Sequence, residues 1–195
     1  MSETAKQLSA RLETANNSVM AFVESCSDEE WERHSEHEGR NVRTVIRHIA
    51  GAYHVQGLML QAMVAGTWVP LTDEVVNASN ARFDSHDGTF TKAEALEKLS
   101  ARADKLAATV RGLTDDDLAK TAVYHDGYEP WTIEEFINRN GIGHAEEHLA
   151  GITEHRARLP QRCILRGDGT WTPGGHPSRR RRHIVHHRGQ PAPTL

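Results

Sequence analysis

The stretch NGIGHAEEHLAGITEH, from Asn140 to His155, has two histidines four residues apart in an expected helix. His144 and His148 would lie on one helix face, about 6 Å apart along the axis, where both imidazoles can reach one metal ion. His155 lies on nearly the same face but about 10 Å beyond His148, so we expect it at the rim. The stretch therefore predicts a helix that contributes a pair of metal ligands.

The spacing alone is weak evidence, because the chain has 13 histidines in 195 residues. About one pair at this spacing is expected by chance, and His183 with His187 forms a second pair. A third histidine on another helix strengthens the first pair. His48 lies beside an apolar stripe, with Ala52 four and Val55 seven residues later, so it should point inward. There it needs a polar partner, which is either a metal or a hydrogen-bond acceptor.

Three neutral imidazoles from two facing helices would bind a divalent transition metal and leave coordination positions open, as catalytic sites do. Zinc, nickel and iron(II) all accept imidazole, and zinc is the metal we expect first. His54 lies about 120° around the helix from His48, so we place it at an edge. The remaining histidines before residue 140 lie in expected loops: His34, His37, His86 and His125.

An alternative interpretation of the same residues is a peptidase. Residues 144–148 match HxxEH, the arrangement of inverted zincins, with Glu147 as a base. Such an enzyme needs a further ligand downstream, and only 47 residues follow His148. We therefore interpret Glu147 as a solvated carboxylate or as one that supports a metal ligand without binding the metal itself.

Three glycines surround the histidine pair. Gly141, Gly143 and Gly151 fall within one expected helix, where each costs about 1 kcal/mol relative to alanine. They indicate either a helix break near residue 141 or a face that leaves room for a ligand or a neighbouring helix.

The spacing of apolar residues predicts an all-α protein with four long amphipathic helices. We expect them at residues 3–24, 41–65, 91–112 and 132–158. Capping-box sequences at 27–30, 91–94 and 132–135 indicate helix starts. About 25 residues, including a helical segment near 73–83, connect the second helix to the third. No strand is convincing, although residues 121–131 have some β character. The pattern favours an antiparallel four-helix bundle with a long crossover between helices 2 and 3.

Charge divides the chain into two parts. Residues 1–159 have 16 basic and 26 acidic residues, a net charge of −10, whereas residues 160–195 have seven arginines and one aspartate. We expect residues 1–159 to form the bundle and residues 160–195 to form a disordered basic tail. The acidic bundle should repel nucleic acid, so any binding to nucleic acid would involve the tail and its four arginines at 179–182.

Other features point to a cytoplasmic protein. No run of 18 apolar residues is present, which excludes a transmembrane helix, and the N-terminus lacks the pattern of a secretory signal. Cys26 and Cys163 are far apart and form neither a disulfide framework nor a CxxC site.

Three segments in order resemble the DinB-like superfamily of metal-binding four-helix bundles. They are VRTVIRHIAGAYH (42–54), the crossover containing NASN (77–80), and GHAEEHLAGI (143–152). That superfamily includes mycothiol-dependent maleylpyruvate isomerases and related bacterial thiol transferases. The resemblance covers roughly residues 5–158. It implies a three-histidine metal site at His48, His144 and His148, and often a homodimer.

The resemblance also implies a reaction. A divalent ion on three neutral ligands would favour the thiolate of a low-molecular-weight thiol such as mycothiol or bacillithiol, which could attack a small electrophile. We therefore expect a metal-dependent thiol S-transferase or isomerase. Arg43, Arg47 or Arg139 could hold a substrate carboxylate, and no acid–base residue stands out. The alternative is a non-catalytic protein that binds metal or sequesters a ligand in a stress response.

Overall fold

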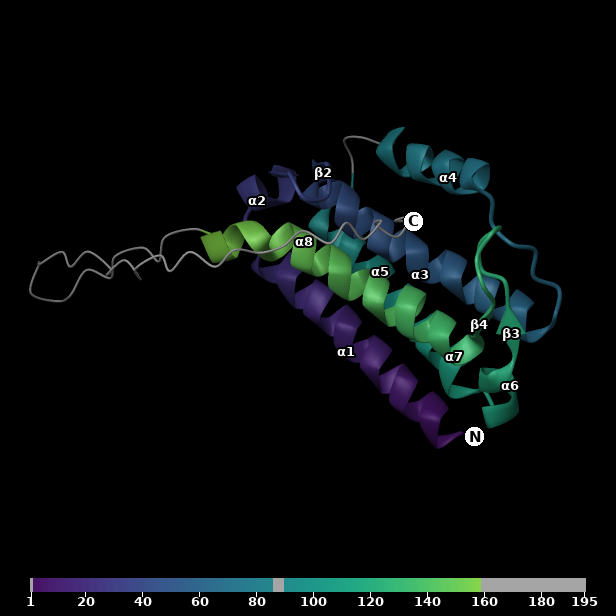
Figure 1. The fold of residues 1–195 in the computed structure, drawn as a ribbon. Coiled ribbons are helices and arrows are strands. Elements are labelled where there is room, and N and C mark those ends of the chain that lie inside the picture. The colour runs from purple at the N-terminus through teal and green to yellow at the C-terminus, as the bar shows by residue number, and fades with distance from the viewer. Residues whose placement is uncertain (1, 86–89, 159–195) are drawn as a thin grey trace, which may run out of the picture. The chain divides into compact units, whose positions relative to one another are not determined.

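Four long helices form the bundle, as the sequence predicted (Figure 1). The computed structural model describes residues 2–85 and 90–158, without the side chains of 82–85 and 155–158. Three of the helices are α1 (Glu3–Ser25), α3 (Val42–Val64) and α5 (Lys92–Arg111). The fourth is continuous but has three segments: α7 (Ile133–Phe136), the π-helix η1 (Ile137–Gly143) and α8 (His144–Arg158).

The long crossover determines which helices are antiparallel. α5 packs against both α1 and α3, and η1 contacts the same two helices. The backbone N–H of Ser2, at the start of α1, donates to Leu113 O just after α5 (3.4 Å), so α1 and α5 are antiparallel. The crossover, which contains α4 (Asp73–Ser85), returns the chain along the bundle, so α3 and α5 run in the same direction (Figure 1).

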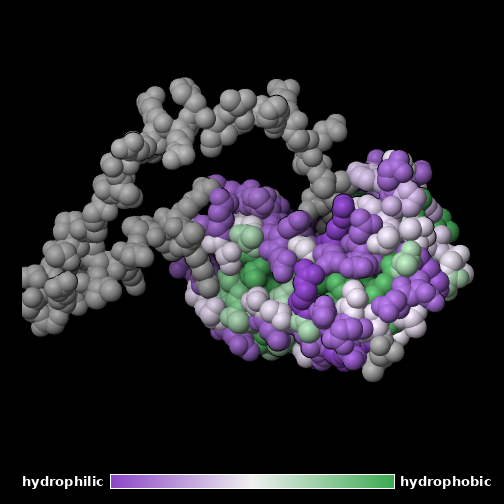
Figure 2. Space-filling model, turned by 60° about the horizontal axis from the view of Figure 1, so that its bottom comes forward, coloured by the Kyte–Doolittle hydropathy of each residue, from purple (hydrophilic) through white to green (hydrophobic). Residues whose placement is uncertain are grey.

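The apolar stripes of the helices form the core. The apolar residues that recur at steps of three and four along α1 are all buried: Leu8, Leu12, Ala15, Val19 and Phe22. On α3, Met59 is buried whereas Leu58 is 53% exposed, so the inward stripe passes through Met59. Val55 is 43% exposed, and our expectation that it shares the inward face with His48 is wrong. Hydrophilic residues cover most of the face seen in Figure 2, with hydrophobic ones between them.

Hydrogen-bonded capping boxes begin helices at the three predicted positions and also at Thr114. In each box a side-chain oxygen accepts a backbone N–H three residues later, and a carboxylate there accepts from the cap residue. The cap residues are Ser27 for α2 (Asp28–Glu32), Thr91 for α5, Thr114 for α6 (Asp115–Ala119) and Thr132 for α7.

Two short hairpins correct the expectation that the chain has no strands. β1 (His34–Ser35) pairs with β2 (Arg40–Asn41), and β3 (Thr121–Ala122) pairs with β4 (Trp131–Thr132), both antiparallel. Strands of two residues are too short to show an alternating pattern. The β character of residues 121–131 has its partner within the same stretch.

The fourth helix changes register and does not break at Gly141. The π-helical turn leaves the Asn140 carbonyl accessible to a side chain, and Gln56 Nε2 of α3 donates to it at 2.5 Å. π-Helical turns occur often at functional sites. No helix in residues 2–85 and 90–158 is long and apolar enough to cross a membrane. The predictions for His86 and for residues 160–195 lie outside the described residues.

Candidate metal centre

The bundle interior brings His48, His144 and His148 together from two facing helices. His48 is on α3, His144 begins α8 immediately after the π-helical turn, and His148 follows one turn later. All three residues are buried, with exposed fractions of 2%, 8% and 3% of the whole residue respectively. Residues 96 positions apart in sequence are therefore neighbours inside the core.

The ring nitrogens lie at separations that suit one metal ion. Each histidine offers one nitrogen, and these three nitrogens are within 4.8 Å of one another. The Nε2 atoms of His48 and His144 are 3.1 Å apart. Two nitrogens bound to one tetrahedral zinc at about 2.0–2.1 Å would lie about 3.3 Å apart. The separation of the His48 and His144 nitrogens is thus close to that of two ligands on one ion.

The environment keeps His144 neutral. Burial, with a smaller contribution from the neighbouring His148, lowers the pKa of His144 to about 3. A neutral imidazole has a lone pair to offer to a metal, whereas an imidazolium has none. At neutral pH, His144 is therefore in the protonation state that a ligand requires.

Glu38 is the residue at this site that the sequence did not reveal. Its carboxylate Oε2 lies 2.7 Å from His148 Nδ1, and the Glu38 side chain is only 7% exposed. The other ring nitrogen of His148, Nε2, is buried and has no hydrogen-bond partner among the described residues. A carboxylate on one nitrogen and a free lone pair on the other is a common arrangement of metal-binding histidines.

Gly151 makes room for a neighbouring part of the protein, whereas Gly141 would tolerate a methyl group. A methyl group on Gly151 would overlap the Glu38 carboxylate and lie 2.6 Å from the His37 ring. One on Gly141 would lie 3.4 Å from a Leu12 methyl group of α1. Gly151 accommodates the β1–β2 hairpin, and Gly141 faces α1.

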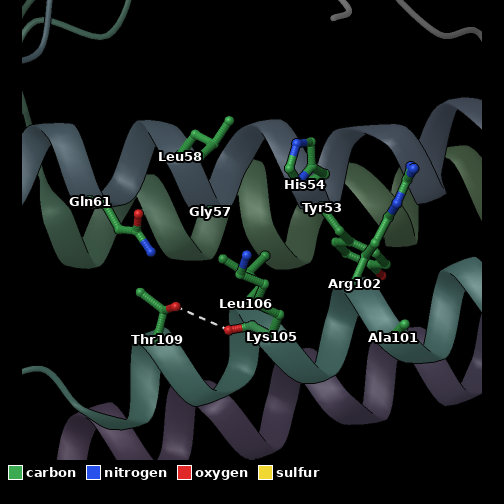
Figure 3. Close-up of a pocket in the computed structure, with 10 residues that line it drawn as sticks. All are labelled: Tyr53, His54, Gly57, Leu58, Gln61, Ala101, Arg102, Lys105, Leu106 and Thr109. Carbon is green, nitrogen blue, oxygen red and sulfur yellow. Dashed lines mark hydrogen bonds between the residues drawn. The ribbon is translucent and has the colours of Figure 1, made fainter.

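The other candidate side chains that the structure describes are not part of the cluster. His54 is exposed and lines a pocket between α3 and α5 together with Tyr53 and Leu106 (Figure 3), which agrees with the predicted edge position. Glu147 is exposed, which agrees with a solvated carboxylate and not with a peptidase base. His34 is exposed, and His125 is buried beside Asp73, 3.3 Å from its carboxylate. The His155 side chain is not described.

The arginines considered for a substrate carboxylate have different surroundings. Arg43 forms an ion pair with Glu32, at 2.8 Å. The guanidinium of Arg139 stacks over the Trp131 ring, 4.7 Å from its centre. Arg47 is half-buried on α3, next to His48. Arg43 and Arg139 thus each have a partner side chain within the protein.

Comparison with known proteins finds a family profile that matches the sequence and a solved structure with a similar fold. The sequence profile described as the DinB superfamily matches residues 11–152. The fold is similar to that of YfiT from Bacillus subtilis, described as a probable metal-dependent hydrolase with an unusual four-helix bundle topology. That similarity has a TM-score of 0.63 and 20% sequence identity, and covers 82% of this chain and 90% of YfiT. No curated protein matches the chain.

Proposed function

The chain belongs to the DinB superfamily, and on this premise we propose that it is a metal-dependent enzyme. His48, His144 and His148 would bind one divalent transition metal. The observation that carries this proposal is the buried Nε2 of His148, which has no hydrogen-bond partner among the described residues and lies beside two other histidines. A buried polar atom without a partner is costly, and a metal would remove that cost.

We propose zinc as the metal, with nickel and iron(II) as the alternatives. Three protein ligands, of which three histidines are one known set, are usual for catalytic zinc and leave a coordination position open for other molecules. Such an ion supplies Lewis acidity, which lowers the pKa of a thiol or water that it binds. The chain itself would hold three neutral imidazoles in place and keep bulk water out of the core.

The reaction that we propose is transfer of a low-molecular-weight thiol to a small electrophile, or isomerisation through such a thiol. Mycothiol or bacillithiol would be the cosubstrate. Membership of a superfamily that includes mycothiol-dependent isomerases and bacterial thiol transferases supports this choice. The buried imidazole cluster supports it too, because a water-poor site protects a reactive thiolate from side reactions.

Two other functions, hydrolysis and sequestration without catalysis, can be distinguished from thiol transfer by experiment. The similarity to YfiT favours metal-dependent hydrolysis, and a bundle that only sequesters a metal or ligand would show no turnover. We would incubate the zinc-loaded protein with cell thiols and electrophiles, and separately with esters and amides, and follow products by mass spectrometry. Thiol adducts that form only with protein support the transferase. Products without added thiol indicate a hydrolase, and no products indicate sequestration.

The metal site has a direct test in the full-length chain. We expect about one metal ion per chain by elemental analysis, and loss of nearly all of it in His48→Ala, His144→Ala and His148→Ala. The control is His54→Ala, which removes an exposed histidine of the same helix as His48. Metal retained after His48→Ala would refute the three-histidine site. Loss only in a His183→Ala, His187→Ala double variant would place the metal in residues 160–195.

The remaining proposals concern cellular context. We propose a cytoplasmic homodimer whose partners are the thiol and the electrophile, with contact to nucleic acid confined to the arginines at 179–182. Light scattering of the purified chain would measure the oligomeric state, and a monomer at micromolar concentration would exclude the dimer.

A further inference from the structure

We propose that Glu38 is a positioning residue that sets the tautomer and orientation of His148. In this role, the carboxylate accepts the Nδ1–H of His148, so that the Nε2 lone pair faces His48 and His144. The metal-binding part of the inference rests on the proposed function, whereas the tautomer can be observed without any metal.

The position of Glu38 is fixed by the β1–β2 hairpin, which is attached to α8 beyond His148. Arg33 Nη2 donates to Ile152 O at 2.7 Å, and Ser35 Oγ donates to Gly151 O at 3.2 Å. Ser35 also accepts the backbone N–H of Glu38, at 3.4 Å. The turn then closes at Gly39, whose φ of 63° favours glycine. Backbone and side-chain contacts thus hold the carboxylate at His148.

The chemistry of the contact determines what it does. A carboxylate without a proton can only accept, so it selects the tautomer with hydrogen on Nδ1 and leaves the lone pair on Nε2. Both side chains are nearly buried, with exposed fractions of 4% for His148 and 7% for Glu38. In that environment an interaction with a charged acceptor is stronger than at the surface. Glu147, next to His148 in sequence, is exposed and makes no such contact.

Gly151 provides independent support, because its lack of a side chain is what admits the carboxylate. It follows His148 by three residues on α8, so both lie on the helix face that meets the hairpin. Any larger residue would displace the Glu38 carboxylate or the His37 ring. The glycine would otherwise weaken the helix by about 1 kcal/mol relative to alanine.

The test uses the full-length protein and four variants. Glu38→Ala removes the acceptor, Glu38→Gln keeps an acceptor without its charge, and Gly151→Ala displaces the carboxylate without altering it. Gly57→Ala is the matched control, because a methyl group on this helical glycine would meet only Leu106, at 3.9 Å. Nitrogen-15 NMR of the metal-free proteins at pH 8 reports the His148 tautomer. Chelator competition measures the dissociation constant of Zn²⁺.

We expect Glu38→Ala and Gly151→Ala to lose the single tautomer and to bind Zn²⁺ about 10- to 100-fold more weakly. Glu38→Gln should keep the tautomer and lose less than about tenfold, and Gly57→Ala should match the wild type. An unchanged tautomer and a Zn²⁺ affinity within twofold of wild type in Glu38→Ala would overturn the inference. If Glu38→Ala does not fold, Gly151→Ala decides in the same way. If the wild type binds no metal, the proposed function fails, and the tautomer alone decides the role of Glu38.

Discussion

The two β-hairpins are built alike but are attached to different parts of the bundle. Each precedes a long helix, and the first helical residue donates its backbone N–H to the residue before the hairpin. These bonds join Val42 to Arg33 O at 2.9 Å and Ile133 to Lys120 O at 2.8 Å. Both preceding residues are cations whose side chains donate to backbone carbonyls, on α8 for Arg33 and α3 for Lys120.

The hairpins differ in the side chains that they bring to the bundle. The first places the Glu38 carboxylate on His148. The second packs the Tyr124 ring against Trp131 and Phe136, with ring centres 5.1 and 5.7 Å away. Its backbone also binds the crossover, through hydrogen bonds to both polar groups of Leu71. Two hairpins with the same backbone arrangement therefore differ in role: the first contacts the candidate metal centre, and the second anchors the crossover.

The largest expected effect tests whether the second hairpin is purely structural. Tyr124→Ala removes a ring that is only 7% exposed, so we expect the free energy of unfolding in urea to fall by about 3 kcal/mol. Zn²⁺ affinity of the folded variant should stay within twofold of wild type. Tyr128→Ala, at a residue that is 44% exposed, is the control and should lose less than about 1 kcal/mol. A folded Tyr124→Ala protein with weakened metal binding would break the distinction between the hairpins.

A smaller effect is expected at the N-caps of α3 and α7, which directly follow the two hairpins. Thr132 Oγ1 accepts the Glu135 N–H at 3.1 Å, so Thr132→Ala should lower the free energy of unfolding by about 1 kcal/mol. Asn41 caps α3 without a side-chain hydrogen bond, so Asn41→Ala should cost only a few tenths of 1 kcal/mol. Equal losses in the two variants, measured by urea unfolding, would contradict this difference.

The smallest expected effect is a pH dependence of stability that arises from Asp117 on α6, just before the second hairpin. Hydrogen bonds from Lys120, then from Thr114, lower the pKa of Asp117 to about 2. A lowered pKa stabilises the fold above the unfolded value of about 3.9, and this stabilisation is lost as pH falls through about 2. Asp117→Asn should therefore lower Tm slightly at pH 7, by at most about 2 °C. The difference from wild type should disappear near pH 2, and a constant difference at both pH values would refute the assignment.

Patterns within a few residues of sequence predicted the features that depend only on neighbouring residues, such as helix faces and helix caps. The stripe of α1 and the capping boxes at Thr91 and Thr132 are repeats or pairs within a few positions, and all are present. His48 was expected inside the bundle, and it is buried there beside the other two histidines. The supporting argument from Val55 failed, because the apolar stripe of α3 turns away from that residue. A 3.6-residue period indicates which face of a helix is buried, but not how far around the helix the buried residues extend.

The sequence by itself predicted the four helices and the crossover, because apolar periodicity is a property of single segments. It also singled out His48, His144 and His148 as candidate ligands, although their spacing alone was weak evidence. Only the tertiary structure showed that the β1–β2 hairpin reaches α8, where Glu38 meets His148 across 110 residues of chain. Gly151 was visible in the sequence, but its meaning depends on what lies against it. A contact between distant residues leaves no periodic signal in the sequence, so the role of Glu38 beside His148 could be recognised only in the folded structure.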